Sequence, residues 1–155
     1  IESEGSDRNT LRLGEAAERT ILSTASVNKN TVVVLFAGAP IDMSEWIDKV
    51  AAVVYAGFPG ERGGEAIVNV LTGKVNPSGK LSETFPLFYE DTPTADSYMD
   101  CKLTRYKEGI DVGYRYYDTY NKRVLFPFGH GLSYSTFVYK NLSLEKRGDC
   151  ALKVS

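Results

Sequence analysis

Two short apolar runs, separated by a polar stretch, limit most strongly what this chain can fold into. Residues 31–36 read TVVVLF and residues 51–56 read AAVVYA, and neither run alternates between polar and apolar side chains. Such runs are typical of central strands that are covered on both faces, as in a parallel sheet. Between them, Asp42 or Ser44 can cap a short helix that continues over residues 46–50. The order strand, helix, strand predicts a βαβ unit with parallel strands.

Further helices are predicted on both sides of this unit. Residues 9–27 carry apolar side chains at helical spacing, and Glu18 falls among the charged residues of the opposite face. The segment NKN at residues 28–30 is expected to end this helix, because Asn tolerates the left-handed conformation of a C-cap. A second apolar helix is predicted over residues 65–71, after a glycine-rich turn at 58–64. Together these elements predict an α/β fold.

Regular patterning weakens in the second half of the chain. Residues 80–85 alternate and predict a strand that Pro86 ends. Residues 87–128 show no periodicity and are rich in Tyr, Asp, Gly and Pro, which is typical of a long functional loop. Residues 132–144 alternate loosely and predict β-structure that begins another, β-rich unit.

Composition limits the kind of protein and its partners. The 155 residues suit one domain, and a net charge of -2 without any basic run argues against nucleic-acid binding. No apolar run approaches the ~20 residues of a membrane span. The chain has no initiator Met, so we expect it to be an excised part of a longer protein. Cys101 and Cys150 are too far apart in the sequence for a zinc or redox motif. They either form a disulfide or stay free thiols in a reducing compartment such as the cytoplasm, and free thiols are expected.

The segment ESEGSDR at residues 2–8 has two interpretations. It can be an ordinary helix entrance, in which Asp7 or Asn9 caps the helix and the acids favour the positive end of its dipole. Alternatively, a Glu on a glycine-hinged loop can act as the carboxylic acid of a glycosidase, which uses one carboxyl group to protonate the leaving oxygen and a second to attack or to activate water. Composition alone does not decide between them.

Two other motifs carry weaker signals. The segment GERGGEA at residues 60–66 lacks the Lys-Ser/Thr of a phosphate-binding loop, and close backbone packing at a strand–helix corner explains its glycines better. His130 is the only histidine and has no evident Ser or Cys partner, so we expect a structural or hydrogen-bonding role. Neither motif predicts a metal or cofactor site.

Taken in order, the motifs of the chain resemble the C-terminal half of glycoside hydrolase family 3, of the β-glucosidase type. The resemblance extends over nearly the whole sequence, and it rests on the shared order and spacing of several segments rather than on any one of them. These segments are ESEGSDR (2–8), GERGGEA (60–66), NPSGKL (76–81), TFP (84–86), EGIDVGYRYYD (108–118) and FPFGHGLSY (126–134).

The resemblance implies a fold and a role. It implies a flavodoxin-like three-layer α/β sandwich with a mostly parallel sheet over residues 1–134, incomplete at its N-terminus, and the start of a fibronectin type III-like domain over residues 135–155. It implies that a separate (β/α)8 barrel of the same enzyme supplies an Asp nucleophile, that the substrate is a β-linked glucoside or a related oligosaccharide, and that no cofactor is needed.

The resemblance also assigns site residues. The Glu directly before the Gly of the first motif is the general acid/base of the family, and this is Glu4 here, with Glu2 in reserve. Asp7 and Arg8 are then expected to support the loop, since Arg8 can make a bidentate contact with a carboxylate. With one of the two carboxyl groups, the chain is expected to be inactive alone.

Two other functional classes remain open from the sequence. The tyrosine-rich residues 98–120 can present stacking faces to sugars, which describes a non-catalytic carbohydrate-binding or scaffold module. A small flavodoxin-like domain that binds an anionic cofactor at residues 60–66 is the third alternative, and it lacks the phosphate motif.

Overall fold

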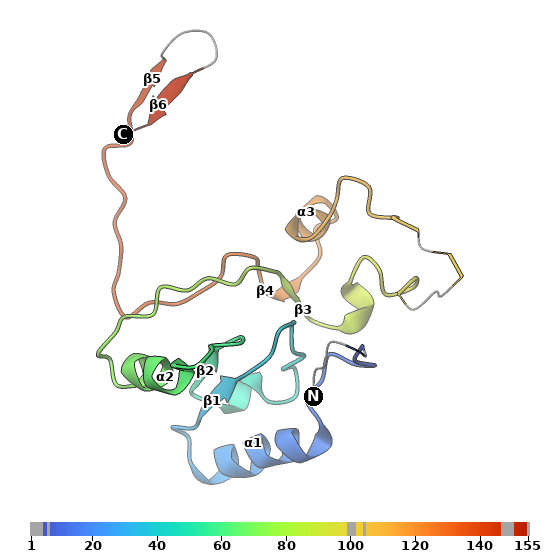
Figure 1. Cartoon of the computed structure of the whole chain (residues 1–155), viewed down its shortest axis with the longest axis vertical. Helices are drawn as coiled ribbons and strands as arrows, with labels where there is room; N and C mark the ends of the chain where they lie inside the picture. Colours follow the sequence, from blue (N-terminus) through green and yellow to red (C-terminus); the bar gives the residue numbers. More distant parts are fainter. Residues whose placement is uncertain (1–4, 6, 99–101, 104, 147–150, 155) are drawn as a thin grey trace.

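The computed structural model describes residues 5, 7–98, 102–103, 105–146 and 151–154 (Figure 1). The helices in this part of the chain are α1 (Glu15–Val27), α2 (Gly63–Leu71) and α3 (Tyr114–Thr119), with 3-10 turns η1 (Ile47–Lys49) and η2 (Tyr89–Asp91). The strands form 2-stranded sheets, of which the first is parallel and the others are antiparallel. These strands are β1 (Val32–Leu35) with β2 (Ala52–Tyr55), β3 (Phe85–Pro86) with β4 (Val124–Phe126), and β5 (Leu144–Lys146) with β6 (Leu152–Val154).

The predicted parallel pairing of the two apolar runs is confirmed, but the helix predicted between them is only the 3-10 turn η1. β1 and β2 pair in parallel from Val32 opposite Ala52 to Leu35 opposite Tyr55. The core gathers around β1 and the loop that follows it, and apolar side chains of α1 pack against this cluster. Its buried members are Val33, Leu35, Ala37, Ile41, Met43, Trp46 and Phe85.

Burial along the two strands differs from the prediction. Val32 is 42% exposed whereas Val33 is buried, so β1 is well covered on one face only within the described part of the chain. α2 leaves Val68 and Leu71 exposed as well. The continuous apolar pattern therefore predicted more covering structure than these residues supply.

The first helix begins later than predicted. α1 starts at Glu15, after an N-cap at Gly14 that makes no side-chain capping bond, so neither Asp7 nor Asn9 caps it. The preceding segment instead forms an isolated parallel bridge between Arg12 and Asp42. At the other end, the helix stops at Val27, just before the predicted segment 28–30, but its C-cap Asn28 has φ -139°, so the expected left-handed C-cap is wrong.

The loop after β1 carries part of the core. The Asp42 carboxylate accepts a hydrogen bond from the Ser44 amide at 2.9 Å, which closes a local turn. The prediction that Asp42 or Ser44 caps the following helix is wrong, because η1 has its N-cap at Trp46 and no side-chain capping bond. The turn that follows leads into η1 and buries the Trp46 indole completely. This arrangement fixes the path of the chain at the carboxyl end of β1.

The glycine-rich turn before α2 confirms close packing at a strand–helix corner. A Cβ atom on Gly63 would lie 2.6 Å from Cγ of the Pro59 ring, whereas a Cβ atom on Gly64 would meet nothing within 4 Å. A methyl group at position 63 would therefore clash with Pro59, whereas one at position 64 would not.

The substitution Gly63→Ala is expected to destabilise the protein by about 1–3 kcal/mol, because the rigid proline ring must move. The control Gly64→Ala is expected to stabilise it by about 0.5 kcal/mol, because it removes backbone freedom without a clash. Urea unfolding of both variants measures the difference. Equal midpoints for the two variants would contradict this account of the turn.

Two motifs of the second half lie side by side. The Leu81 amide donates to the His130 carbonyl, and the Gly129 amide donates back to the Leu81 carbonyl, both at 2.8 Å. The Asn76 side chain accepts from the Tyr134 amide at 2.9 Å and from the Ser133 hydroxyl at 3.0 Å. The turn at 76–81 and the segment 126–134 therefore form one structural unit.

The strand predicted over 80–85 is much shorter in the structure. Only Phe85 and Pro86 pair with β4, so Pro86 belongs to the strand instead of ending it. A proline is tolerated there because, among the described residues, β3 pairs only with β4, so no donor is needed at its other edge.

The prediction of a structureless loop over 87–128 is wrong. The described part of this range contains η2, α3 and β4. Tyr117 anchors α3 because it is 7% exposed, and Tyr116 contacts both Tyr117 and Tyr120 through their rings. Ring packing at irregular spacing orders this range, so sequence periodicity does not reveal it.

The predicted β-structure over 132–144 is also wrong. No strand occurs between 132 and 143, and β5 begins only at Leu144. The chain runs extended from the body to the β5–β6 hairpin (Figure 1). The exposed Phe137, Val138 and Tyr139 lie on this extended stretch.

Candidate functional site

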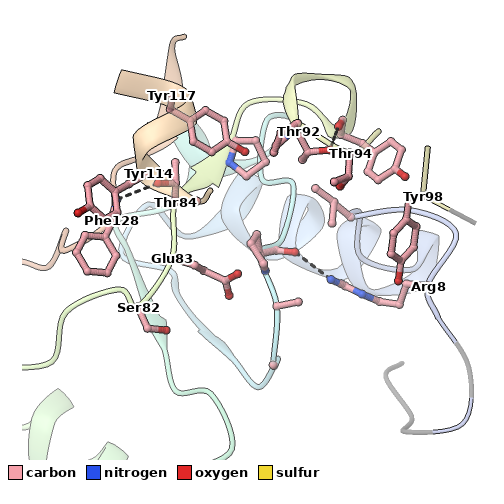
Figure 2. Close-up of a pocket in the computed structure, with 18 of the residues that line it drawn as sticks. Arg8, Ser82, Glu83, Thr84, Thr92, Thr94, Tyr98, Tyr114, Tyr117 and Phe128 are labelled. Carbon is pink, nitrogen blue, oxygen red and sulfur yellow. Dashed lines mark hydrogen bonds between the residues drawn. The ribbon is translucent and has the colours of Figure 1, made fainter. Parts of the chain in front are cut away.

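An open cleft of about 1080 Å³ lies between segments that are far apart in the sequence (Figure 2). Its walls come from residues between 7 and 11, 38 and 40, 82 and 86, 89 and 98, and 113 and 128, together with Phe58. The loop after β1, the short strand β3 and helix α3 hold these walls in place. Threonine and tyrosine hydroxyls, a guanidinium and carboxylates line it, so the cleft can receive a polar ligand such as a sugar.

Asp7 and Arg8, which were predicted to support the catalytic loop, line one end of this cleft. The Arg8 guanidinium donates to the Pro40 carbonyl at 3.0 Å (Figure 2). Asp7 accepts a hydrogen bond from the Tyr98 hydroxyl, and this bond raises the pKa of Tyr98. Arg8 is thus joined to the loop after β1, and Asp7 is joined to Tyr98. Glu2 and Glu4 lie outside the described residues.

Aromatic rings form the opposite end of the cleft. Tyr114 and Phe128 stack with their centroids 4.9 Å apart and their planes 19° from parallel. Tyr117 lies beside them in the lining, and burial raises its pKa to about 12, helped by the charges of Tyr116, Asp91 and Glu83. Burial disfavours the charged phenolate, so Tyr117 keeps its proton well above neutral pH.

The raised pKa of Tyr117 predicts a loss of stability in alkaline solution. An unfolded tyrosine titrates near pH 10, so the contribution of Tyr117 is present below about pH 10 and is lost as the pH rises through about 12. We expect Tyr117→Phe to lessen the decline in unfolding free energy between pH 9 and pH 11.5 by at most about 2 kcal/mol. Urea titrations at the two pH values measure it, with Tyr139→Phe as the exposed control. The same decline in both variants would contradict the assignment.

The remaining sequence motifs have structural roles. The His130 ring stacks on Phe126 at 4.7 Å and its backbone takes part in the pairing with Leu81, which fits the structural role predicted for it. Within the described ranges, no group of three His, Cys, Asp or Glu side chains could hold a metal ion. Cys101 and Cys150 are outside these ranges. No helix in the described part of the chain has the length and apolar character needed to cross a membrane.

Sequence reasoning missed several residues of the cleft. Glu83 and Phe58 line it, but the sequence places them in a strand and in a turn, whereas Tyr98 belongs to the tyrosine-rich residues 98–120 that can present stacking faces to sugars. Phe58 carries a weak signal in the sequence, because it is an aromatic residue at the start of the glycine-rich turn. In the structure it is 77% exposed. Exposed aromatic rings beside polar groups are common where sugars or other ring-bearing ligands bind.

Curated relatives of this chain are glycosidases. It is 48% identical over 147 residues to thermostable beta-glucosidase B of Acetivibrio thermocellus, and 45% identical over 155 residues to beta-glucosidase B of Emericella nidulans. The alignments cover 94% and 90% of this chain but 19% and 18% of those proteins. The chain thus spans about a fifth of the length of these relatives.

Solved structures agree with the sequence comparison. The chain matches beta-glucosidase 3B of Thermotoga neapolitana with a TM-score of 0.88 and 35% identity, over 97% of this chain and 23% of that one. It matches a β-glucosidase of Streptomyces venezuelae, in complex with D-glucose, with a TM-score of 0.86 and 40% identity, over 97% of this chain and 20% of that one.

The family comparison covers both the cleft and the motifs. Residues 1–134 match the model of the glycosyl hydrolase family 3 C-terminal domain, and this range contains every residue that lines the cleft. The relatives, the solved structures and the ordered motifs all agree with this match. The chain therefore belongs to glycoside hydrolase family 3, as its C-terminal domain.

Proposed function

We propose that this chain is part of a retaining β-glycosidase of the β-glucosidase type, which hydrolyses O-glycosidic bonds at the non-reducing ends of β-linked glucosides. The observation that carries this proposal is the 48% identity to a β-glucosidase over 94% of the chain. The cleft supports it, because hydroxyl, carboxylate and guanidinium groups face stacked rings there. Sugars present both hydroxyl groups and apolar ring faces, so this combination suits them.

In this proposal Glu4 is the general acid/base, with Glu2 in reserve. Glu4 protonates the glycosidic oxygen as the bond to the leaving group breaks, and then removes a proton from the water that attacks the glycosyl-enzyme. Asp7 and Arg8, which follow in the same motif, line the cleft and hold the adjacent backbone, and this supports the assignment. The nucleophile is an Asp of a (β/α)8 barrel that belongs to the same enzyme.

The proposal includes an architecture. Residues 1–134 form part of a three-layer α/β sandwich with a mostly parallel sheet, and residues 135–155 begin a fibronectin type III-like domain. The parallel pairing of β1 with β2, the flanking α1 and the exposed apolar side chains of β1 and α2 support the first part. The β5–β6 hairpin beyond the extended stretch supports the second.

The test is hydrolysis of a nitrophenyl β-glucoside by this chain alone and by the chain mixed with its separately produced barrel. We expect activity in the mixture only, because each part holds one of the two carboxyl groups that the reaction needs. Activity of the chain alone would show that a second carboxyl here completes a site, and would contradict the assignment of the nucleophile to the barrel. An inactive mixture that is shown to assemble would favour the carbohydrate-binding module instead.

A further inference from the structure

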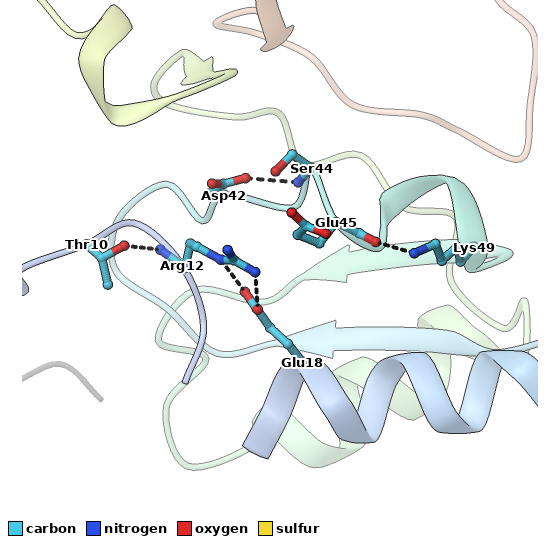
Figure 3. A network of polar contacts seen from close by, with 7 residues as sticks. All are labelled: Thr10, Arg12, Glu18, Asp42, Ser44, Glu45 and Lys49. Atoms are coloured by element: carbon cyan, nitrogen blue, oxygen red, sulfur yellow. Dashed lines mark hydrogen bonds and ion pairs between the residues drawn. The ribbon is translucent and has the colours of Figure 1, made fainter. Parts of the chain in front are cut away.

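A buried carboxylate on the first turn of α1 is bonded to the segment before the helix. Glu18 is 8% exposed, and its carboxylate accepts from Nε of Arg12 at 3.1 Å and from Nη2 of Arg12 at 2.5 Å. Helical spacing predicted Glu18 on the exposed face, and this is wrong because Arg12 folds across it (Figure 3).

A contribution to folding stability does not by itself explain the Arg12–Glu18 ion pair. A buried ion pair recovers its desolvation cost only with good geometry, and apolar side chains of similar volume often replace such pairs without loss. The bidentate contact does fix the orientation of the two side chains, because the planar guanidinium meets both carboxylate oxygens in one orientation only. The pair therefore fixes the position of Arg12 along α1.

Further hydrogen bonds tie the same short segment to the loop after β1. The Arg8 guanidinium donates to the Pro40 carbonyl at 3.0 Å, and the Asp42 amide donates to the Leu11 carbonyl at 2.9 Å. With the Arg12–Glu18 pair, these bonds join residues 8–12 to both α1 and the 40–42 loop. The segment lies in no helix or strand, so these contacts set its path.

Local charge keeps Arg12 firmly cationic. The hydrogen bond and the charge of Glu18 raise the pKa of Arg12, and the nearby charges of Glu45 and Asp42 add to this (Figure 3). A swap of the two charged partners would place a carboxylate beside Asp42 and Glu45, where like charges repel. Arginine is thus favoured at position 12 and the carboxylate at position 18.

We infer that Arg12 and Glu18 are positioning residues, whose ion pair sets the path of segment 8–12 and so the placement of Asp7 and Arg8, the described end of the acid/base motif, at the cleft. This inference rests on the proposed role of Glu4, which is four residues before Arg8 in the chain. Displacement of a catalytic group by about 1 Å can cost about 100-fold in rate, so a contact outside the cleft can govern the proton transfer.

The test compares leaving groups in the complete enzyme. Glu18→Gln is expected to lower kcat/KM about 10- to 100-fold for methyl β-glucoside, whose departure needs a proton, and by less than about 3-fold for 2,4-dinitrophenyl β-glucoside, which leaves unaided. Glu15→Gln is the matched control, because Glu15 lies on the same helix turn and forms an exposed pair with Arg19 at 4.0 Å. That variant is expected to match the wild type with both substrates.

Parallel measurements separate the possible failures. Arg12→Lys keeps the charge but loses the bidentate contact. It is therefore expected to lower kcat/KM less than Glu18→Gln does, with the same dependence on the leaving group. If Glu18→Gln does not fold, Arg12→Lys takes its place in the comparison. Equal losses with both substrates, or no difference from Glu15→Gln, would overturn the positioning role. Glu4→Gln is assayed beside them: if it shows no dependence on leaving group, the proposed role of Glu4, on which this inference rests, fails.

Discussion

In the complete enzyme, Glu4→Gln is expected to lower kcat/KM for methyl β-glucoside by about 10²- to 10⁴-fold, the range for loss of a general acid. The amide keeps the shape of the side chain but cannot supply a proton to the leaving oxygen. A dinitrophenolate leaves without that proton, so kcat/KM for 2,4-dinitrophenyl β-glucoside is expected to change far less. Steady-state kinetics with the two substrates measures the contrast.

The reserve residue gives this prediction a matched control. Glu2 belongs to the same motif and has the same side chain, so Glu2→Gln is expected to leave the leaving-group dependence unchanged. If the large selective loss occurs in Glu2→Gln instead, the acid/base role belongs to Glu2. If neither variant shows it, the chain does not supply the general acid.

The second large effect is on stability. Trp46→Ala is expected to destabilise the protein by about 3–5 kcal/mol, because it leaves a large cavity beneath β1. Trp46 is 0% exposed, and it belongs to the cluster that contains Met43 and Phe85. Its indole N–H has no hydrogen-bond partner among the described residues, so Trp46→Phe is expected to cost less, since it removes an unsatisfied donor with part of the ring.

Urea unfolding followed by circular dichroism tests this prediction, because Trp46 is the only tryptophan and its fluorescence disappears with it. Phe58→Ala is the control for loss of an aromatic ring, since Phe58 is 77% exposed and its loss is expected to cost less than about 0.5 kcal/mol. Equal effects of Trp46→Ala and Phe58→Ala would show that the core does not centre on Trp46.

The sequence predicted the elements that carry a continuous apolar run or a sustained helical repeat. The runs at 31–36 and 51–56 became β1 and β2 with the expected parallel pairing. The start of α1 was predicted too early, because the helical repeat begins only near Leu13 and the Leu11 carbonyl accepts from the Asp42 amide instead of a helical amide. Glu18 was placed on the wrong face for the same reason, since its partner Arg12 comes from outside the helix.

The second half shows where periodicity fails. α3 is a short helix held by Tyr117 and its neighbouring rings, and β3 is a pair of residues that includes a proline. Both depend on contacts between segments distant in sequence, such as the Phe128 amide with the Thr84 hydroxyl at 3.3 Å. The spacing of apolar residues within one segment does not predict such contacts.

The site was predicted through the resemblance rather than through chemistry visible in the sequence. Asp7 and Arg8 were assigned from their motif, and they do line the cleft. Glu83 joins them only in three dimensions, because nothing in its local sequence distinguishes it from other acidic residues of the chain. Tyr98 was expected only as a sugar-stacking residue within 98–120. The acid/base assignment to Glu4 stays a prediction, since that residue lies outside the described ranges.

The most direct measurement of the central claim is product analysis with azide. The complete enzyme carrying Glu4→Ala is supplied with 2,4-dinitrophenyl β-glucoside and sodium azide. Because azide needs no general base, it is expected to attack the glycosyl-enzyme, restore turnover and yield β-glucosyl azide, with the retained configuration. Turnover that azide does not change, or an α-glucosyl azide product, would contradict the assignment of Glu4 as the acid/base of a retaining enzyme.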